Sequence, residues 1–510
     1  MLFLEQIDTY RNSDRLAFQN GEQSLSYSRL HRYSDRLAAL IRQRLGDDRS
    51  PLLVYGHKSP LMLVSFLACV KAGHAYCPID LSFPHSRVQD IVDAVEPKLI
   101  LATADWPLEH SEAVLTEADM DQLIRQEPAE GDEPFDWRAV SVREDETYYI
   151  IFTSGSTGKP KGVQITYANL NHYIAWINTV GTSKTQKVYL NQAPFSFDLS
   201  VMDLHLSLAN EGTLYAIDKE IQLDYAKLFA ALRAGRLNVW VSTPSFADIC
   251  LADPSFSEEE MPGLELFLFC GETLTNKTAA RLKKRFPQAQ VFNTYGPTES
   301  TVCITEVEIT DEVLAKYEPL PIGAAKPGTL VRIQNGDEIL PAGEAGEIVI
   351  LGDTVSSGYF KNPQQSEKAF FTDTVTGMRG YRTGDKGYLK DGQLFYQGRI
   401  DLQIKLHGYR IEIEDIESNL MKLPGMDKVV VLPNIDKQQK VKSITAYCMY
   451  QPPAEAKEEP EAEQVARIKQ ELAAFVPAYM IPKKIVLMDA IPVTTNGKAD
   501  RRALLKELGK

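Results

Sequence analysis

The sequence predicts an α/β fold with a largely parallel central sheet. Short buried runs separated by helices are typical of parallel sheets that helices cover. A length of 510 residues, with 44% hydrophobic residues, allows a large core and more than one domain. Five strand-like runs alternate with helix-like stretches: SPLLVYG (50–56), YYIIFTS (148–154), LNVWVSTP (237–244), LELFLFCG (264–271) and GEIVILG (346–352).

No feature of the sequence predicts membrane insertion or secretion. The most apolar run, Leu61 to Val70, is about half of the ~20 residues that a membrane span needs. The N-terminus is charged from Glu5 and lacks a basic region followed by an apolar stretch. The six cysteines include no CxxC pair, which indicates neither a structural zinc site nor a disulfide framework. We expect a cytoplasmic protein without stable membrane insertion, and a monomer.

The composition and the pattern of apolar residues change after Gly352, which predicts a second, smaller domain. Glycines become frequent, and the alternation Gln403–Leu406 is typical of a hairpin. We expect domains at 1–400 and 401–510, with the boundary near Asp401. Exposed acidic, Pro-rich loops are expected at 127–136 and 451–464. Within the small domain the pattern predicts a helix over 413–423, strands over 428–433 and 443–450, and a helix ending near Phe475.

The net charge of −14 argues against nucleic acid as a partner, because phosphate binding needs a basic surface. The charge is uneven: residues 401–510 contain 16 acidic and 17 basic residues, so residues 1–400 carry a balance of −15. A near-neutral small domain tolerates an acidic partner better than the large domain does.

The segment Thr153–Gly162 (TSGSTGKPKG) follows an apolar strand and predicts a phosphate-binding loop. Its glycines let backbone N–H groups approach an anion, and its hydroxyls and lysines add donors and positive charge. It is not a Walker loop, because Lys159 is followed by Pro160 and the glycine spacing differs. The alternative is an ordinary solvent loop, since such residues gather in turns.

Seven further motifs occur along the chain in a fixed order: LSYSRL (25–30), KAGHAYCPID (71–80), NTYGPTE (293–299), 343–358, YRTGD (381–385), GRID (398–401) and NGK (496–498). Together with TSGSTGKPKG they resemble the adenylate-forming superfamily of acyl-CoA synthetases, luciferases and amino-acid-activating adenylation domains. The resemblance covers about residues 25–500. It implies a large N-terminal domain with mixed sheets and a β-barrel-like subdomain, and a small mobile α+β C-terminal domain.

The resemblance implies an ATP- and Mg²⁺-dependent ligase. Such enzymes join a carboxylate to the α-phosphate of ATP and then pass the acyl group to a thiol. Lys498 is the implied catalytic residue, because a compact flexible cation suits two converging anions. Thr298 would donate to the α-phosphate, and Glu299 would be the magnesium ligand. Without the resemblance, Lys498 is an ordinary solvated lysine, and Glu299 is a surface residue beside a turn.

The resemblance also implies the remaining nucleotide contacts. Tyr295 would stack on adenine, Asp385 would accept from the ribose hydroxyls, and Arg399 would add a ribose or phosphate contact. Turn and surface roles are the alternatives for Asp385 and Arg399. Asp401 would be the hinge about which the small domain rotates, or else a plain turn residue. The full expected ATP-binding set is Thr153, Ser154, Gly155, Thr157, Lys159, Asn293, Thr294, Tyr295, Gly296, Pro297, Thr298, Asp385, Tyr396, Gln397, Gly398, Arg399 and Lys498.

Four residues, besides Lys498, are expected to bind the acid. Asp198 would pair with a substrate ammonium, because a carboxylate facing an apolar acyl chain costs on the order of 1–5 kcal/mol; helix capping is its alternative role. Met202, one helical turn later, would shorten the pocket, or pack in the core. Cys270 stands where most amino-acid-activating relatives have glycine, so its side chain would exclude one enantiomer; it is otherwise a buried hydrophobe. Val302 is expected at the same pocket.

These residues resemble the superfamily members that activate D-alanine for a separate carrier protein. The implied partners are D-alanine and a small acidic D-alanyl carrier protein with a phosphopantetheine arm, and the alanyl group then goes to teichoic acids. Two alternatives stay open. One is a freestanding adenylation enzyme for glycine or another small amino acid, and the other is a catalytically silent nucleotide-binding module.

Overall fold

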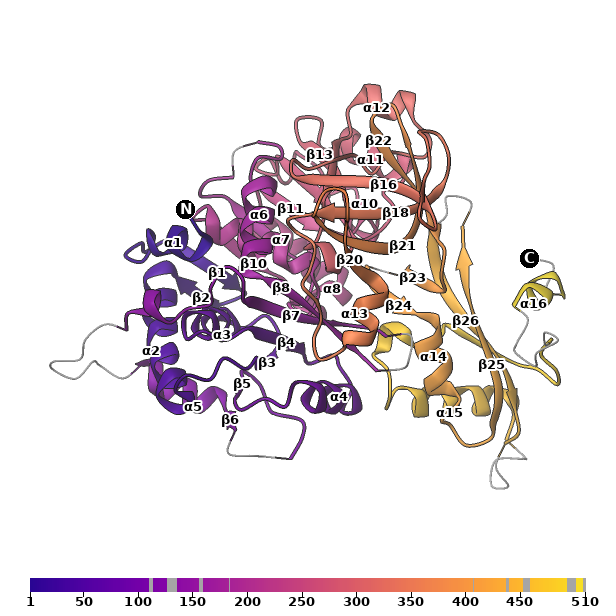
Figure 1. Ribbon diagram of the computed structural model, residues 1–510, viewed down its shortest axis with the longest axis horizontal. Helices are drawn as coiled ribbons and strands as arrows, with labels where there is room; N and C mark the ends of the chain where they lie inside the picture. Colours follow the sequence, from indigo (N-terminus) through magenta and orange to yellow (C-terminus); the bar gives the residue numbers. More distant parts are fainter. Residues whose placement is uncertain are drawn as a thin grey trace. The chain divides into compact units, whose positions relative to one another are not determined.

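The computed structural model describes residues 1–109, 113–125, 135–155, 159–182, 184–406, 408–436, 440–452, 459–492 and 501–507. The chain divides into two compact units (Figure 1). The larger unit comprises residues 1–81, 94–152 and 162–398. The smaller unit comprises residues 82–93, 153–161 and 399–510. The predicted α/β class is confirmed.

Two sheets of mainly parallel strands form the larger unit. One has the order β19-β8-β7-β4-β3-β5-β6 and the other β15-β14-β13-β12-β11-β9-β10-β1-β2. The bounds in the first are β19 Gly358–Tyr359, β8 Lys161–Thr166, β7 Thr147–Thr153, β4 Tyr76–Asp80, β3 Leu52–Gly56, β5 Ile100–Ala102 and β6 Val114–Leu115. Those in the second are β15 Ala324–Ala325, β14 Thr305–Glu308, β13 Gln290–Tyr295, β12 Leu266–Phe269, β11 Val239–Ser242, β9 Val188–Asn191, β10 Thr213–Ala216, β1 Leu16–Asn20 and β2 Gln23–Ser26.

The third sheet of this unit corrects one prediction. The run 346–352 forms β18, which pairs antiparallel with both neighbours rather than joining a parallel core. An apolar run shows that a strand is buried but not which way its partners run. The sheet has the order β17-β16-β18-β21-β20, with β22 on β21; the bounds are β17 Glu338–Ile339, β16 Thr329–Asn335, β18 Gly346–Gly352, β21 Arg379–Lys390, β20 Phe370–Thr372 and β22 Gln393–Arg399.

Helices bury the faces of these sheets. The run Leu61–Val70 lies in α3 (Pro60–Lys71), which is buried from Leu61 to Lys71 because it packs against α2 (Tyr27–Leu45) and against strands β1 to β4 (Figure 1). No helix in the described part of the chain has the length and apolar character to cross a membrane. The other helices of this unit are α1 Phe3–Asp8, α5 Glu117–Arg125, η1 Trp137–Ala139, α6 Tyr167–Ile177, α7 Leu199–Ala209, α8 Lys219–Leu223, α9 Tyr225–Ala234, α10 Pro244–Leu251, α11 Asn276–Arg285, η2 Thr298–Ser300, α12 Asp311–Lys316 and α13 Pro363–Ala369.

The smaller unit has its own hydrophobic core. The predicted hairpin forms from β23 (Gln403–Leu406) and β24 (Tyr409–Glu412), and a three-stranded sheet follows with the order β25-β26-β27. The bounds are β25 Met426–Ile435, β26 Val441–Tyr450 and β27 Lys484–Leu487, with helices α4 His85–Val95, α14 Ile413–Leu420, α15 Glu461–Leu472, η4 Ala478–Met480 and α16 Arg501–Glu507. The helix expected over 413–423 ends at Leu420. Most of the expected loop at 127–136 lies outside the described residues, as do residues 453–458 of the loop expected at 451–464. That second loop is shorter than expected, because α15 already begins at Glu461.

The division of the chain differs from the predicted 1–400 and 401–510. The break falls after Gly398, and two segments from early in the chain join the smaller unit. Specific contacts hold them there: Ser86 Oγ donates to the Ala474 carbonyl at 2.7 Å, and the Arg87 guanidinium lies 3.5 Å from the Asp415 carboxylate. Such contacts between distant segments leave no local pattern in the sequence.

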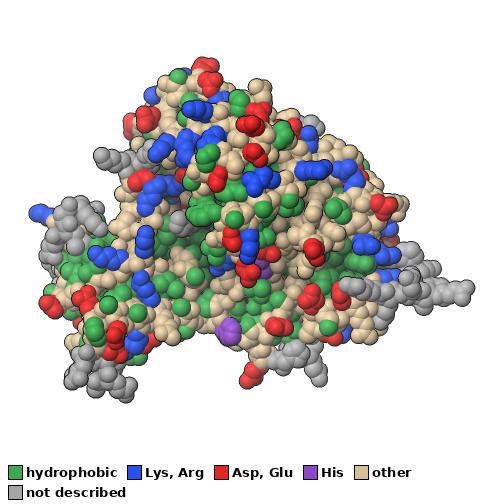
Figure 2. Space-filling view, turned by 180° about the vertical axis from the view of Figure 1, so that it is seen from behind, with side chains coloured by type: hydrophobic (Ala, Val, Ile, Leu, Met, Phe, Trp, Pro, Cys, Tyr) green, Lys and Arg blue, Asp and Glu red, His purple; other side chains and the backbone are tan. Residues whose placement is uncertain are grey.

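On the face drawn in Figure 2, acidic and basic side chains are interspersed.

Candidate functional site

The expected substrate residues of the larger unit follow parallel strands at one edge of a sheet. Cys270 comes directly after β12, and Tyr295 ends β13. Asp198 follows β9 and precedes α7. Because β9, β11, β12 and β13 run parallel, their carboxyl ends meet at the same edge. Crevices at such an edge are the usual ligand sites of open α/β sheets.

Asp198 does not cap α7 with its side chain. Its backbone is already helical (φ −63°, ψ −25°), and the carboxylate makes no capping hydrogen bond. Instead, Thr298 Oγ1 donates to Asp198 Oδ2 at 2.6 Å. A hydrogen bond therefore joins Asp198, which is expected to bind the amino acid, to Thr298, which is expected to bind the α-phosphate. Met202, one turn along α7, is fully buried.

Glu299 lies in η2 and is completely buried. Tyr359 Oη donates to Glu299 Oε1 at 2.8 Å. Mg²⁺ binds in proteins through one or two carboxylates together with phosphate oxygens. Glu299 therefore fits the magnesium role, and the described residues contain no cluster of three or more His, Cys, Asp or Glu that would form a metal cage by itself. Sequence reasoning missed Tyr359, although it directly follows the motif 343–358.

The backbone after η2 is strained. Thr301 and Val302 both adopt left-handed φ values, 61° and 68°, although both are β-branched. Such a conformation costs about 1–3 kcal/mol per residue and is typical of functional sites. The Val302 carbonyl accepts from Cys270 Sγ at 3.6 Å. A Cβ at Gly296 would lie 2.4 Å from the Cys303 Cα and 2.9 Å from this carbonyl, so this position requires glycine.

Cys270 has two neighbours that the sequence did not indicate, Cys303 and Tyr173. Cys303 is fully buried, and its thiol donates to Tyr173 Oη at 3.8 Å. Burial raises the pKa of Cys303, and its contact with Cys270 raises it further. A thiol held protonated in this way is a poor nucleophile, so Cys303 forms part of the pocket wall rather than a reactive group.

Two of the expected nucleotide residues are joined at the end of β13. Tyr295 Oη donates to Asp385 Oδ2 at 2.5 Å, and both side chains are buried. The Tyr295 ring lies 6.4 Å from the Tyr396 ring, at 39°. The side chains of Asn293 and Thr294 instead bond to the carbonyls of neighbouring segments, at 2.8 and 2.9 Å.

The remaining expected residues of the larger unit frame this region through their backbone. Pro297 is the N-cap of η2, and the missing side chain of Gly296 leaves room for the Val302 carbonyl. Gly398 has a positive φ of 109°, and the Gln397 side chain is exposed.

The phosphate-loop residues belong to the smaller unit. Ser154 Oγ donates to the Arg410 carbonyl at 2.9 Å and accepts from the Glu412 amide at 3.2 Å. A Cβ at Gly155 would lie 2.1 Å from the Lys159 carbonyl, so the loop folds back on itself only with glycine there. Thr153 is partly buried and Lys159 is exposed. Thr157 lies outside the described residues.

Arg399 contacts Asp401 in the structure. Its Nε and Nη2 donate to Asp401 Oδ1 and Oδ2, at 2.9 and 2.6 Å. Burial acts to raise the pKa of Asp401, but the hydrogen bonds and the positive charge of Arg399 lower that pKa below its usual value. The expected nucleotide contact and the expected hinge residue thus form one bidentate pair. Lys498 lies outside the described residues.

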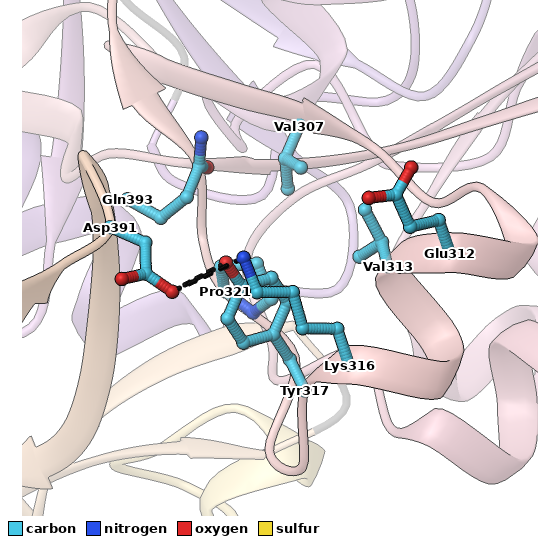
Figure 3. Close-up of a pocket in the computed structure, with 8 residues that line it drawn as sticks. All are labelled: Val307, Glu312, Val313, Lys316, Tyr317, Pro321, Asp391 and Gln393. Carbon is cyan, nitrogen blue, oxygen red and sulfur yellow. Dashed lines mark hydrogen bonds and ion pairs between the residues drawn. The ribbon is translucent and has the colours of Figure 1, made fainter.

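A separate pocket of about 200 Å³ contains none of the expected site residues (Figure 3). Tyr317 Oη donates to Asp391 Oδ2 at 3.0 Å, and Lys316 Nζ lies 3.3 Å from the same carboxylate. These contacts pair Asp391 with Lys316 and Tyr317 at its rim. It is a surface hollow between α12 and β22.

Comparison with known proteins gives consistent results. The family described as AMP-binding enzyme matches residues 5–360, and the AMP-binding enzyme C-terminal domain matches residues 415–498. The D-alanine–D-alanyl carrier protein ligase of Bacillus licheniformis is 46% identical over 511 residues, covering 100% of both chains. A holo NRPS protein containing adenylation and PCP domains superposes with a TM-score of 0.79 at 26% identity, over 99% of this chain and 84% of that one. The Vibrio cholerae adenylation domain AlmE, solved with glycyl-adenosine-5′-phosphate, has the same fold (TM-score 0.82, 22% identity, 99% and 97% covered).

Proposed function

This chain belongs to the AMP-binding enzyme family, and from that premise we propose that it activates D-alanine with ATP and loads it on a carrier protein. A carboxylate oxygen of D-alanine attacks the α-phosphorus of ATP, the bond to the β-phosphate breaks, and pyrophosphate leaves. The phosphopantetheine thiol of a small acidic carrier protein, after losing its proton, then attacks the acyl carbon, and AMP leaves. The carrier thioester is the product. We place this reaction in the cytoplasm, in a monomeric enzyme.

The carboxylate of Asp198 is the observation that carries this proposal. It lies at the carboxyl edge of the sheet, is not used to cap α7, and bonds to Thr298. A substrate ammonium at Asp198 Oδ1 or Oδ2 would place an amino acid next to the hydroxyl proposed for the α-phosphate. The chain is 46% identical, over its full length, to a relative named as a D-alanine–D-alanyl carrier protein ligase, and this similarity supports D-alanine as that amino acid.

We assign the other roles as the motifs imply them. Tyr295, Asp385, Tyr396 and the phosphate loop bind ATP, Lys498 supplies positive charge to the reacting oxygens, and Asp401 is the hinge at the boundary near residue 400. Glu299 would hold Mg²⁺, which neutralises phosphate charge when bound. Met202 limits the length of the side-chain pocket, and Val302 shapes its wall.

Amino-acid-dependent exchange of pyrophosphate into ATP tests the proposal. D-Alanine is expected to support the fastest exchange, and holo carrier protein, but not its apo form, is expected to accept the alanyl group. Faster exchange with glycine or L-alanine would indicate an adenylation enzyme for another small amino acid. Absence of exchange with every amino acid would indicate a silent nucleotide-binding module.

Cys270→Ala is expected to reduce the preference for D-alanine over L-alanine about tenfold. The thiol is held by the Val302 carbonyl, so its bulk stays in one position, and its removal leaves room for the other enantiomer. One well-placed steric contact is worth about 1–3 kcal/mol of discrimination. The measurement is the ratio of kcat/KM for the two enantiomers in exchange.

Cys250→Ala is the matched control, since Cys250 is an equally buried cysteine in α10. It is expected to leave the enantiomer ratio unchanged. An unchanged ratio in Cys270→Ala as well would refute the steric role.

A further inference from the structure

Glu299 and Tyr359 are held in register by three hydrogen bonds between their segments. The Ser356 amide donates to the Glu299 carbonyl at 2.9 Å, and Thr301 Oγ1 donates to the Thr354 carbonyl at 2.8 Å. The third is the bond from Tyr359 Oη to Glu299 Oε1, at 2.8 Å. The segment 354–359 therefore lies along the segment 299–301, and the carboxylate cannot turn without breaking the tyrosine contact.

Contacts other than the hydrogen bond to Glu299 hold Tyr359 in place. Its amide donates to Ser366 Oγ at 2.9 Å, and its backbone pairs with Val163 across the antiparallel β19 and β8. Its ring packs edge-on against Phe370, with centroids 5.2 Å apart at 68°. The side chain is 5% exposed. The phenol oxygen is therefore held in place, and its hydrogen bond restrains the rotation of the Glu299 carboxyl group.

A neutral donor is well suited to this task. A lysine or arginine at this place would add a positive charge that competes with a bound cation, whereas a hydroxyl donates a hydrogen bond without adding charge. Orienting groups behind a metal ligand commonly change metal affinity by 10- to 100-fold when removed.

We infer that Tyr359 is a positioning residue that orients the Glu299 carboxylate toward the Mg²⁺ of the bound nucleotide. The inference rests on the proposed function only in taking Mg²⁺·ATP as the nucleotide. Tyr359 contacts neither the amino acid nor the nucleotide in this proposal and acts through Glu299.

Tyr359→Phe tests the inference, because phenylalanine keeps the ring packing and removes only the hydroxyl. ATP binding is measured by calorimetry across a series of Mg²⁺ concentrations, and exchange activity is measured across the same series. The Mg²⁺ concentration at half effect is expected to rise about tenfold in both measurements. ATP binding without Mg²⁺ is expected to stay at the wild-type value. The unfolding temperature is expected to fall by about a few degrees, because a hydrogen bond to a buried carboxyl group is lost.

Two controls separate positioning from a general structural effect. Tyr215→Phe removes a tyrosine hydrogen bond of similar length, from Tyr215 Oη to the Ala231 carbonyl at 3.0 Å, away from η2. It is expected to leave the Mg²⁺ dependence unchanged. In a Glu299→Gln background, Tyr359→Phe is expected to change the Mg²⁺ dependence less than twofold, because its effect passes through the carboxylate.

Each outcome decides the inference separately from the proposed function. An unchanged Mg²⁺ dependence in Tyr359→Phe, or a full tenfold effect persisting in Glu299→Gln, would overturn it. ATP binding by the wild type that does not depend on Mg²⁺ would also overturn it. Mg²⁺-dependent ATP binding without amino-acid-dependent exchange would remove the proposed function and leave the inference standing, provided the Tyr359→Phe shift is found in binding.

Discussion

Asp198→Asn is expected to lower kcat/KM for D-alanine about 10²- to 10³-fold. Asparagine is nearly isosteric and still accepts the hydrogen bond from Thr298, but it carries no charge for the substrate ammonium. Breaking a buried ion pair by removing one partner costs about 3–5 kcal/mol, and each 1.36 kcal/mol is a factor of ten. The measurement is exchange activity as a function of D-alanine concentration, with ATP saturating.

One matched control variant shows whether the effect is specific to Asp198. Asp224→Asn changes an aspartate at the start of α9, where the side chain caps the helix by accepting from the Lys227 amide at 3.1 Å. It is expected to change stability by only about a few tenths of a kcal/mol, because asparagine caps a helix about as well as aspartate, and to leave the KM for D-alanine unchanged. Asp198→Asn with an unaltered KM and kcat would exclude Asp198 from substrate recognition and reopen the question of the acid.

Lys498→Ala is expected to lower the rate of adenylation at least about 10²- to 10³-fold. Lys498 would act on charge that develops as the carboxylate meets the α-phosphate, and removing one donor to such charge costs that factor in kcat. Binding of ATP is expected to remain within a few-fold of wild type, because the phosphate loop, Tyr295 and Asp385 do not depend on Lys498.

Single-turnover formation of the adenylate, with ATP binding measured by calorimetry on the same sample, checks the Lys498 prediction. Lys484→Ala is the matched control, as an exposed lysine at the start of β27 in the same unit. It is expected to have no effect on either measurement. Undiminished adenylation in Lys498→Ala would remove Lys498 from the mechanism.

The sequence was sufficient for four strands of the larger unit and for the hairpin of the smaller unit. The apolar runs at 50–56, 148–154, 237–244 and 264–271 correspond to β3, β7, β11 and β12, because burial on both faces requires continuous apolar residues. The hairpin at β23 and β24 followed from strict alternation. The run at 346–352 was a strand but antiparallel, since a buried run carries no record of the direction of its partners.

The relation between residues of the site was less predictable. Asp198 and Thr298 were each identified by their motifs, but 100 positions separate them, and their hydrogen bond depends on parallel strands ending at the same edge. The left-handed backbone of Thr301 and Val302 was invisible, because β-branched residues disfavour that conformation and only the surrounding contacts impose it.

The sequence by itself determined the α/β class, the order of the motifs and the residue types that carry charge for an ATP-dependent ligase. These follow from local composition, because burial, turn formation and charge are properties of short segments. Only the tertiary structure decided that Tyr359 holds Glu299, that Cys303 and Tyr173 stand behind Cys270, and that Arg399 pairs with Asp401. Such contacts depend on how the strands pair and on which chain segments meet at the same edge of a sheet. Each contact forms between two distant groups, so no single segment of the sequence predicts it.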